Sequence, residues 1–204
     1  MDDPKSIVRD GYDNISHNYR REDFQFEGTG YQAFLTEFEA YFAPGSRILD
    51  LGCGCGIPVA RYLAQRHDVT GVDMSAVQIE RARGLVPSAR FLQADMTEID
   101  FADGSFDAIV SFFAVIHVPV EEQPALLARM RRWLAAGGHL LATVGFMEWT
   151  GTRDEWHGGR MYWSHADRAT YERWLTDAGF TILAERFQPD GDSGHAVFMA
   201  RKEV

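Results

Sequence analysis

Short apolar runs alternate along the chain with segments whose apolar residues recur at helical spacing. The runs are nearly continuous and rich in β-branched residues, which is typical of strands buried on both faces of a sheet. The segment 126–134 has helical spacing and precedes Gly137 and Gly138, where we expect a helix to end. We expect five strands of this kind, at residues 47–51, 68–73, 89–95, 106–116 and 139–145.

Strands that alternate with helices predict right-handed crossovers and a parallel, doubly wound sheet. Helices are expected after the first strand, through residues 59–65, and after Ser75, which forms a Ser-x-x-Gln capping box with Gln78. The last part of the chain departs from this alternation. Residues 179–185 and 195–200 read as two strands joined by the polar turn PDGDSG, which predicts an antiparallel hairpin. The expected fold is therefore an α/β, mostly parallel, seven-stranded Rossmann-like sheet with this hairpin and helices on both faces.

The composition favours one domain and a small-molecule partner. With 204 residues, 46% of them hydrophobic, the chain can fill one core, so we expect a single domain over 1–204. The net charge of −10 argues against a nucleic-acid or anionic-membrane surface. The polar start of the sequence is unlike a secretory signal, and no apolar run approaches the roughly 18 to 20 residues of a membrane span. We expect a cytoplasmic monomer or homodimer.

The two cysteines, Cys53 and Cys55, stand in a glycine-rich segment and invite a metal or redox interpretation. They are too close in sequence for a mutual disulfide. A tetrahedral zinc site needs more sulfur or nitrogen ligands, and no second cysteine pair exists. We therefore expect buried spacers and no metal.

Acidic residues end three of the expected strands, at Asp50, Asp73 and Asp95. The carboxyl ends of parallel strands meet at one edge of the sheet, so the three carboxylates should converge on one cleft. An aspartate at a strand end can also simply cap a helix or solvate a turn, but three in succession favour a binding site. Glycines 52, 54 and 56 follow Asp50, whereas the dinucleotide fingerprint requires a glycine where Ile57 stands. A cationic ligand with a ribose and no phosphate fits this arrangement.

Five segments resemble successive motifs of the class I S-adenosylmethionine-dependent methyltransferases, particularly their small-molecule branch of methyltransferase type 11/25. The resemblance covers about residues 46–145 in order and spacing, and it is specific for fold and cofactor rather than for substrate. The segments are DLGCGCGIP (50–58), VTGVDMS (69–75), FLQADM (91–96), FDAIVSFFAVIH (106–117) and LAAGGHLLATV (134–144).

This resemblance implies a role for each motif residue in holding S-adenosylmethionine, whose product is S-adenosylhomocysteine. Asp50 would lie beside the ammonium group, with the turn Gly52, Cys53 and Gly54 against the methionine part. Asp73 would accept the ribose hydroxyls. The remaining implied cofactor residues are Met74, Asp95 and Met96 at the adenine, Phe112 in the fourth expected strand, and Tyr12 and Tyr19 in an N-terminal helical cover formed by residues 1–45.

Methyl transfer is an in-line displacement, so positioning and exclusion of water do most of the work. A base is needed only for a protonated nucleophile. His117 is one candidate base, and a structural role is its alternative. His165 is the second, because Ser164 to Asp167 read as a capping box that places His165 in a first helical turn, where the helix dipole keeps it neutral. It can equally be a wall of the pocket.

Residues 146–165 are long for a loop, which favours a substrate lid. Its aromatic residues suit a pocket for a flat or apolar acceptor. The predicted acceptor-binding residues are Trp149, Trp156, His157, Tyr162 and Trp163. The leading hypothesis is transfer of a methyl group to nitrogen or oxygen of a small molecule.

Two other functions compete with it. A nicotinamide-dependent oxidoreductase is disfavoured by Ile57 and by the additional acid Asp95. A non-catalytic cofactor-binding accessory protein is compatible with the motifs, although an enclosed aromatic lid suits a substrate better. A metal-assisted catechol-type reaction lacks a convincing set of oxygen ligands beyond the acids already assigned.

Overall fold

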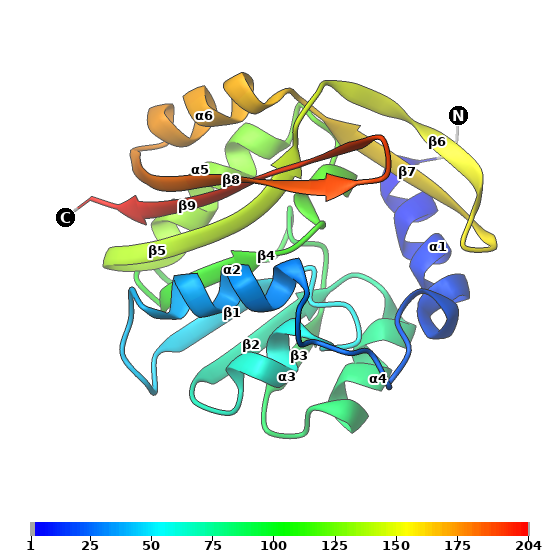
Figure 1. Cartoon of the computed structure of the whole chain (residues 1–204), viewed down its shortest axis with the longest axis horizontal. Helices are drawn as coiled ribbons and strands as arrows, with labels where there is room; N and C mark the ends of the chain where they lie inside the picture. The colour runs from blue at the N-terminus through cyan, green and yellow to red at the C-terminus, as the bar shows by residue number, and fades with distance from the viewer. Residues whose placement is uncertain (1–2, 204) are drawn as a thin grey trace.

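A computed structural model describes residues 3–203 and contains a seven-stranded sheet (Figure 1). The strand order is β3-β2-β1-β4-β5-β9-β8, parallel from β3 to β5 and antiparallel for β9 and β8. This arrangement confirms the expected fold class. The strands are β1 (Arg47–Leu51), β2 (Asp68–Asp73), β3 (Arg90–Gln93), β4 (Phe106–Ser111), β5 (Leu134–Gly145), β8 (Phe180–Asp190) and β9 (Ser193–Lys202).

Helices cover both faces of the sheet. One face packs against α2 (Gly30–Glu39), α3 (Val59–Leu63) and α4 (Ala76–Leu85), and the other packs against α5 (Gln123–Trp133) and α6 (Arg168–Asp177). Each face has its own apolar core because successive residues of a buried strand point to opposite sides. Among residues 3–203, every helix is too short or too polar to span a bilayer.

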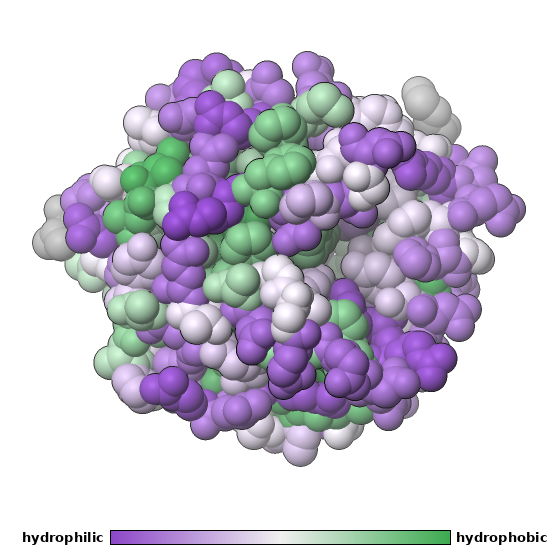
Figure 2. Space-filling view, viewed as in Figure 1, coloured by the Kyte–Doolittle hydropathy of each residue, from purple (hydrophilic) through white to green (hydrophobic). Residues whose placement is uncertain are grey.

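The N-terminal helix α1 (Pro4–Tyr19) lies outside these layers, beside a small two-stranded sheet formed by β6 (Trp149–Trp156) and β7 (Gly159–His165). Gly11 allows the close approach, because a Cβ there would lie 2.4 Å from the carbonyl oxygen of Arg160. The predicted irregular lid at 146–165 is thus mostly a β-hairpin. Seen as a surface, this face of the molecule is largely hydrophilic, with apolar residues gathered over the β8–β9 hairpin and the start of β6 (Figure 2).

Three predicted boundaries were wrong. The fourth strand ends at Ser111, because Phe113 adopts a positive φ of 55° and turns the chain into the short 3-10 helix η1 (Val115–His117). The third strand ends at Gln93, so Asp95 lies in the loop beyond it. Helix α5 ends at Trp133, and β5 runs on through Gly137, whose φ of 74° accompanies a shift in the pairing with β4.

The two predicted capping boxes differ in outcome. Ser75 caps α4 by accepting the N–H of Gln78, although the side chain of Gln78 accepts a hydrogen bond from Ser16 instead of closing the box. The cap of α6 is Asp167, which accepts the N–H of Thr170. The hydroxyl of Ser164 instead accepts the N–H of Val120, so the predicted helix start at Ser164 was wrong.

Candidate functional site

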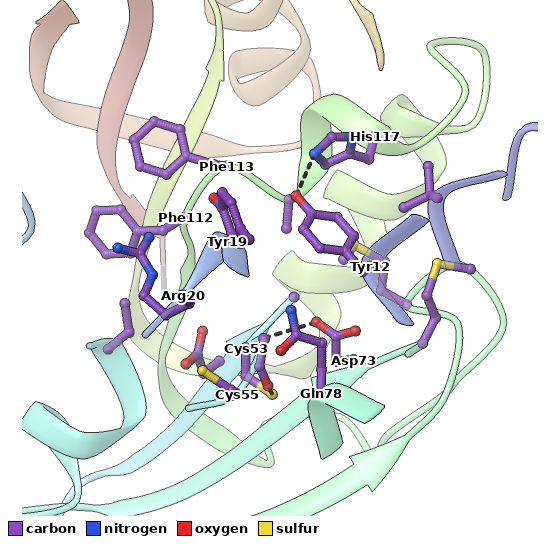
Figure 3. Close-up of a pocket in the computed structure, with 18 of the residues that line it drawn as sticks. Tyr12, Tyr19, Arg20, Cys53, Cys55, Asp73, Gln78, Phe112, Phe113 and His117 are labelled. Carbon is purple, nitrogen blue, oxygen red and sulfur yellow. Dashed lines mark hydrogen bonds between the residues drawn. The ribbon is translucent and has the colours of Figure 1, made fainter. Parts of the chain in front are cut away.

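The principal pocket lies at the carboxyl edge of the parallel strands, under α1 (Figure 3). Its empty volume is about 940 Å³, part of it open to solvent. All eleven residues predicted to hold a cofactor line it: Tyr12, Tyr19, Asp50, Gly52, Cys53, Gly54, Asp73, Met74, Asp95, Met96 and Phe112.

The floor of this pocket is the turn after β1, in which Gly52, Gly54 and Gly56 all have positive φ. The N–H groups of Gly52 and Cys53 both donate to the carbonyl of Val72, which ties the turn to β2. A Cβ at Gly52 would lie 2.1 Å from the Cβ of Ala114, so only glycine fits there. The turn therefore presents bare backbone to a ligand.

Replacing Gly52 by alanine should lower the free energy of unfolding by about 1–3 kcal/mol, through the left-handed backbone and the clash with Ala114. Urea unfolding monitored by circular dichroism measures it. Gly84→Ala is the matched control, because Gly84 lies in α4 with open space around it, and it should stabilise by up to about 1 kcal/mol. Equal destabilisation by both changes would contradict the close approach at Gly52.

Asp50 is an unpartnered carboxylate at the base of the pocket. The side chain is 1% exposed, and its Oδ2 atom has no hydrogen-bond partner within residues 3–203. Burial, with a smaller contribution from the negative charge of Asp73, raises the pKa of Asp50 to about 8. A buried acceptor of this kind requires a partner, and a ligand cation placed in the pocket would supply it.

Asp73 ends β2 with its carboxylate held by two backbone amides. Its Oδ2 accepts the N–H of Gly54 at 2.9 Å and its Oδ1 accepts the N–H of Ser75 at 2.9 Å. Burial raises the pKa of Asp73 to about 6, against the lowering effect of these amides. Each carboxylate oxygen keeps a free lone pair, so the fixed carboxylate can still accept from a pair of hydroxyls.

Asp95 connects the pocket to the N-terminal helix. Its Oδ1 accepts from the N–H and the hydroxyl of Thr97, both at 2.8 Å, and its Oδ2 lies 3.2 Å from the ammonium of Lys5. Lys5 also donates to Glu122 at 2.6 Å. Lys5, Tyr12 and Tyr19 recur every seven residues and therefore share one face of α1, a spacing that could have identified Lys5 as a pocket residue from the sequence.

Helix α1 is anchored to α4 as well. The carboxylate of Asp13 accepts from the hydroxyl of Ser75 and from the N–H of Val77, at the N-terminus of α4, where the helix dipole favours a negative charge. Ser16 donates to Gln78 at 2.7 Å, and Arg81 donates to Ser16. These contacts hold the tyrosine face of α1 over the pocket.

Tyr12 and His117 form a hydrogen-bonded pair at the side of the pocket away from Asp73 (Figure 3). His117 Nδ1 lies 2.6 Å from the carbonyl oxygen of Tyr162, which can only accept, so Nδ1 carries the proton. His117 Nε2 consequently accepts from the Tyr12 hydroxyl at 2.9 Å. Burial lowers the pKa of His117 to about 4 and raises that of Tyr12 well above its usual value. Both groups are neutral at pH 7.

A second pocket adjoins the first and is walled largely by aromatic rings. The β6–β7 hairpin contributes Trp149, Trp156 and Trp163, and the tip of the β8–β9 hairpin contributes residues 190–195. The residues common to the linings of both pockets are Tyr12, Tyr19, Phe113 and His117. The two spaces therefore meet at the Tyr12–His117 pair.

Not all predicted acceptor residues line this second pocket. His157 and Tyr162 are outside the lining of both pockets: His157 lies at the β6–β7 turn with a φ of 50°, and Tyr162 contributes only its carbonyl, to His117. His165 does line the second pocket, but as the last residue of β7 rather than in a helix. Burial, not a helix dipole, lowers the pKa of His165. Its Nδ1 donates to the carbonyl of Met147 at 2.7 Å.

The sequence predicts PDGDSG only as the turn of the β8–β9 hairpin and gives no sign that this turn lines a pocket. The turn brings Asp190 and Asp192 to the second pocket, and Glu148 adds a third carboxylate. One guanidinium, that of Arg153, also lines this pocket, stacked over the rings of Trp149 and Trp163. Carboxylates outnumber it three to one, which favours a cationic ligand.

The chain is similar to several known proteins. Residues 48–138 match the model of a family described as a methyltransferase domain. The chain is 37% identical over 156 residues to phosphoethanolamine N-methyltransferase 1 of Arabidopsis thaliana, covering 70% of this chain and 30% of that protein. It is 33% identical over 143 residues to phosphatidylethanolamine N-methyltransferase of Cereibacter sphaeroides, covering 66% of this chain and 69% of that protein.

Among solved structures, magnesium protoporphyrin IX methyltransferase from Synechocystis PCC 6803 with bound S-adenosylmethionine has a similar fold. The TM-score is 0.74 at 22% identity, covering 100% of this chain and 99% of that one. The first curated relatives are much longer than the part that matches, since this chain spans only 21% to 30% of their length.

Proposed function

This chain belongs to the class I S-adenosylmethionine-dependent methyltransferases, and on that premise we propose that it methylates the nitrogen of a small-molecule amine. The observation that carries the proposal is the junction of two pockets at Tyr12 and His117. A donor bound in one pocket and an acceptor bound in the other would meet beside a group able to take a proton.

The residues of the principal pocket fit S-adenosylmethionine. The unpartnered Oδ2 of buried Asp50 would accept from the cofactor's ammonium, and the bare backbone of Gly52 and Gly54 leaves room for its methionine part. Asp73 would accept the ribose hydroxyls through its remaining lone pairs. When bound, the cofactor supplies an electrophilic methyl group on a sulfonium that departs as a neutral thioether.

The charges of the second pocket favour an amine over an alcohol or a phosphate. Glu148, Asp190 and Asp192 oppose a bound anion, and the aromatic walls stabilise an ammonium through their ring faces. Burial lowers the pKa values of His117 and His195, so these imidazoles add no positive charge at neutral pH. An acceptor carrying one ammonium group matches this environment.

An ammonium acceptor must lose a proton before its nitrogen can attack, and the Tyr12–His117 pair offers a path for that proton. The acceptor N–H would donate to the Tyr12 oxygen while the Tyr12 proton moves to Nε2 of His117. The carbonyl of Tyr162, bonded to Nδ1–H, stabilises the imidazolium that results. Because burial lowers the pKa of His117 to about 4, the imidazolium is only a transient carrier, and Tyr12 and His117 act as a weak but positioned general base.

Release of S-adenosylhomocysteine tests the proposed function. The purified protein is incubated with S-adenosylmethionine and a panel of amines, including ethanolamine, phosphoethanolamine and n-alkylamines, with the matched alcohols as controls. We expect turnover with at least one amine and none with its alcohol, and a mass increase of one methyl group on the amine. Turnover restricted to alcohols, or none with any amine, would contradict the proposal.

Proton release gives an independent test of the role of Asp50. Its pKa of about 8 means that the empty site is mostly protonated at pH 7, whereas a bound ammonium favours the ionised form. Binding of S-adenosylmethionine at pH 7 should therefore release about one proton, and the affinity should fall about tenfold per pH unit below 8. Calorimetry in phosphate and in Tris, whose ionisation heats differ, measures the release.

The Asp50→Asn variant is the control for this measurement, because an amide cannot release the proton. Its binding heat should be nearly the same in both buffers. Equal heats for the native protein in the two buffers would show that Asp50 is not the group that titrates.

A further inference from the structure

A strip of exposed apolar side chains begins in the second pocket and continues outside it. Met147 and Trp149 line the pocket, yet they are 58% and 39% exposed. Phe146 and Phe187 lie next to them and are 38% and 49% exposed. These four residues, which we call the apolar strip, account for four of the six large hydrophobic residues exposed within residues 3–203. Figure 2 shows apolar residues gathered in this region, over the β8–β9 hairpin and the start of β6.

The strip is physically continuous with the pocket. Gly194 lines the pocket, and a Cβ placed on it would lie 2.4 Å from Cζ of Phe187, so the Phe187 ring lies directly over this glycine. The ring of Phe146 then packs edge-on against Phe187, with centroids 4.8 Å apart. An apolar group leaving the pocket at Gly194 would meet these two rings.

The strip is also held in place by hydrogen bonds of its backbone. His165 Nδ1 donates to the carbonyl of Met147 at 2.7 Å, and the N–H of Arg168 donates to the carbonyl of Phe146 at 3.1 Å. Phe187 belongs to the sheet through the pairing of β8 with β9. Single apolar residues scattered over a surface need no explanation, whereas a contiguous apolar surface beside a ligand pocket indicates a binding role.

We propose that the acceptor is an amphiphilic amine whose ammonium enters the second pocket and whose aliphatic tail lies along the apolar strip. This inference rests on the proposed function and specifies its substrate class. The carboxylates Glu148, Asp190 and Asp192 face the charged end, and the four strip residues cover the tail. A short, fully polar amine would leave the strip in water.

A series of n-alkylamines from butylamine to dodecylamine, used below their micelle concentrations, tests the proposal. Burial of a whole methylene changes affinity about fourfold. Because the strip covers one side of the tail, we expect the KM to fall about twofold per added methylene. A KM that is the same for butylamine and dodecylamine would overturn the proposal. Calorimetric binding of the same amines to the protein loaded with S-adenosylhomocysteine provides a readout that needs no turnover.

Edge-strand variants locate the tail. Phe187→Thr in β8 should make the KM depend less on the chain length of the amine. Leu92→Thr, which replaces a 41% exposed residue in β3 at the other edge of the sheet, should leave this dependence intact. Equal effects of the two variants would overturn the proposal. Two further results would overturn the proposal. A change in oligomeric state that depends on Phe187, measured by light scattering, would show that a second copy of the chain covers the strip. Sedimentation with phosphatidylcholine vesicles that depends on Phe187 would show that a membrane covers it.

The two proposals fail in different ways. Chain-length-dependent binding without methylation would contradict the proposed function but support an amphiphile at the strip. Methylation of short and long amines with equal KM would support the proposed function and overturn the amphiphile.

Discussion

Replacing Asp73 by alanine should weaken the binding of S-adenosylmethionine by about 100-fold or more. Two hydrogen bonds from ribose hydroxyls to a charged acceptor contribute about 1.5–3 kcal/mol each, which sets this scale. The same change leaves the N–H groups of Gly54 and Ser75 without their acceptor, so the glycine turn would also lose its support. Calorimetric titration of both variant and native protein measures the loss.

Asp68→Ala is the matched control, because Asp68 begins the strand that Asp73 ends. Asp68 is exposed and pairs with Arg90 at 3.4 Å. This pair lies at the amino ends of the parallel strands, whereas the pocket lies at their carboxyl ends. Replacement of Asp68 should change the affinity by less than about twofold, as expected for a surface ion pair. Undiminished binding in Asp73→Ala, or an equal loss in Asp68→Ala, would contradict the assignment of Asp73 to the ribose.

Replacing Tyr12 by phenylalanine should lower kcat by about 100-fold while the KM for S-adenosylmethionine changes little, because general-base catalysis typically contributes about 10²–10⁴. The ring and its packing against Tyr19 and Trp156 remain, so only the hydroxyl that bridges to His117 is removed. Initial rates of S-adenosylhomocysteine release are measured across pH 6–9 with an amine that the protein methylates. These rates separate kcat from KM.

The control variant for this hydroxyl is Tyr62→Phe. The Tyr62 hydroxyl donates to Glu39 at 2.6 Å in a network with His67, away from both pockets. Its loss should affect stability and leave kcat unchanged. A kcat in Tyr12→Phe equal to that of the native protein would show that the proton leaves by another path.

The parts of the fold that the sequence predicted are those in which local pattern and tertiary position coincide. Asp50 and Asp73 end runs of apolar residues, and such runs form the buried parallel strands whose carboxyl ends meet at one edge. The glycines after Asp50 likewise indicate a tight turn from local sequence alone, since each of them adopts a positive φ. These features depend on few long-range contacts.

The second pocket depends on long-range contacts, and the sequence therefore placed its residues less accurately. His165 follows Ser164, which resembled a helix cap, but the hydroxyl of Ser164 accepts a hydrogen bond from Val120, 44 residues earlier. Asp190 and Asp192 reach the second pocket because β8 and β9 are long and carry their turn past the end of the sheet. Nothing in their own sequence neighbourhood specifies that extension.

The anchoring of α1 has a practical consequence for handling this protein. The helix begins at Pro4, and its second residue, Lys5, already lines the principal pocket. At the other end of the chain, β9 stops at Lys202, on the far side of the molecule from α1 (Figure 1). A purification tag or fluorescent fusion joined next to Asp3 would therefore begin two residues from a side chain that lines the pocket. The same addition after β9 would leave that pocket clear.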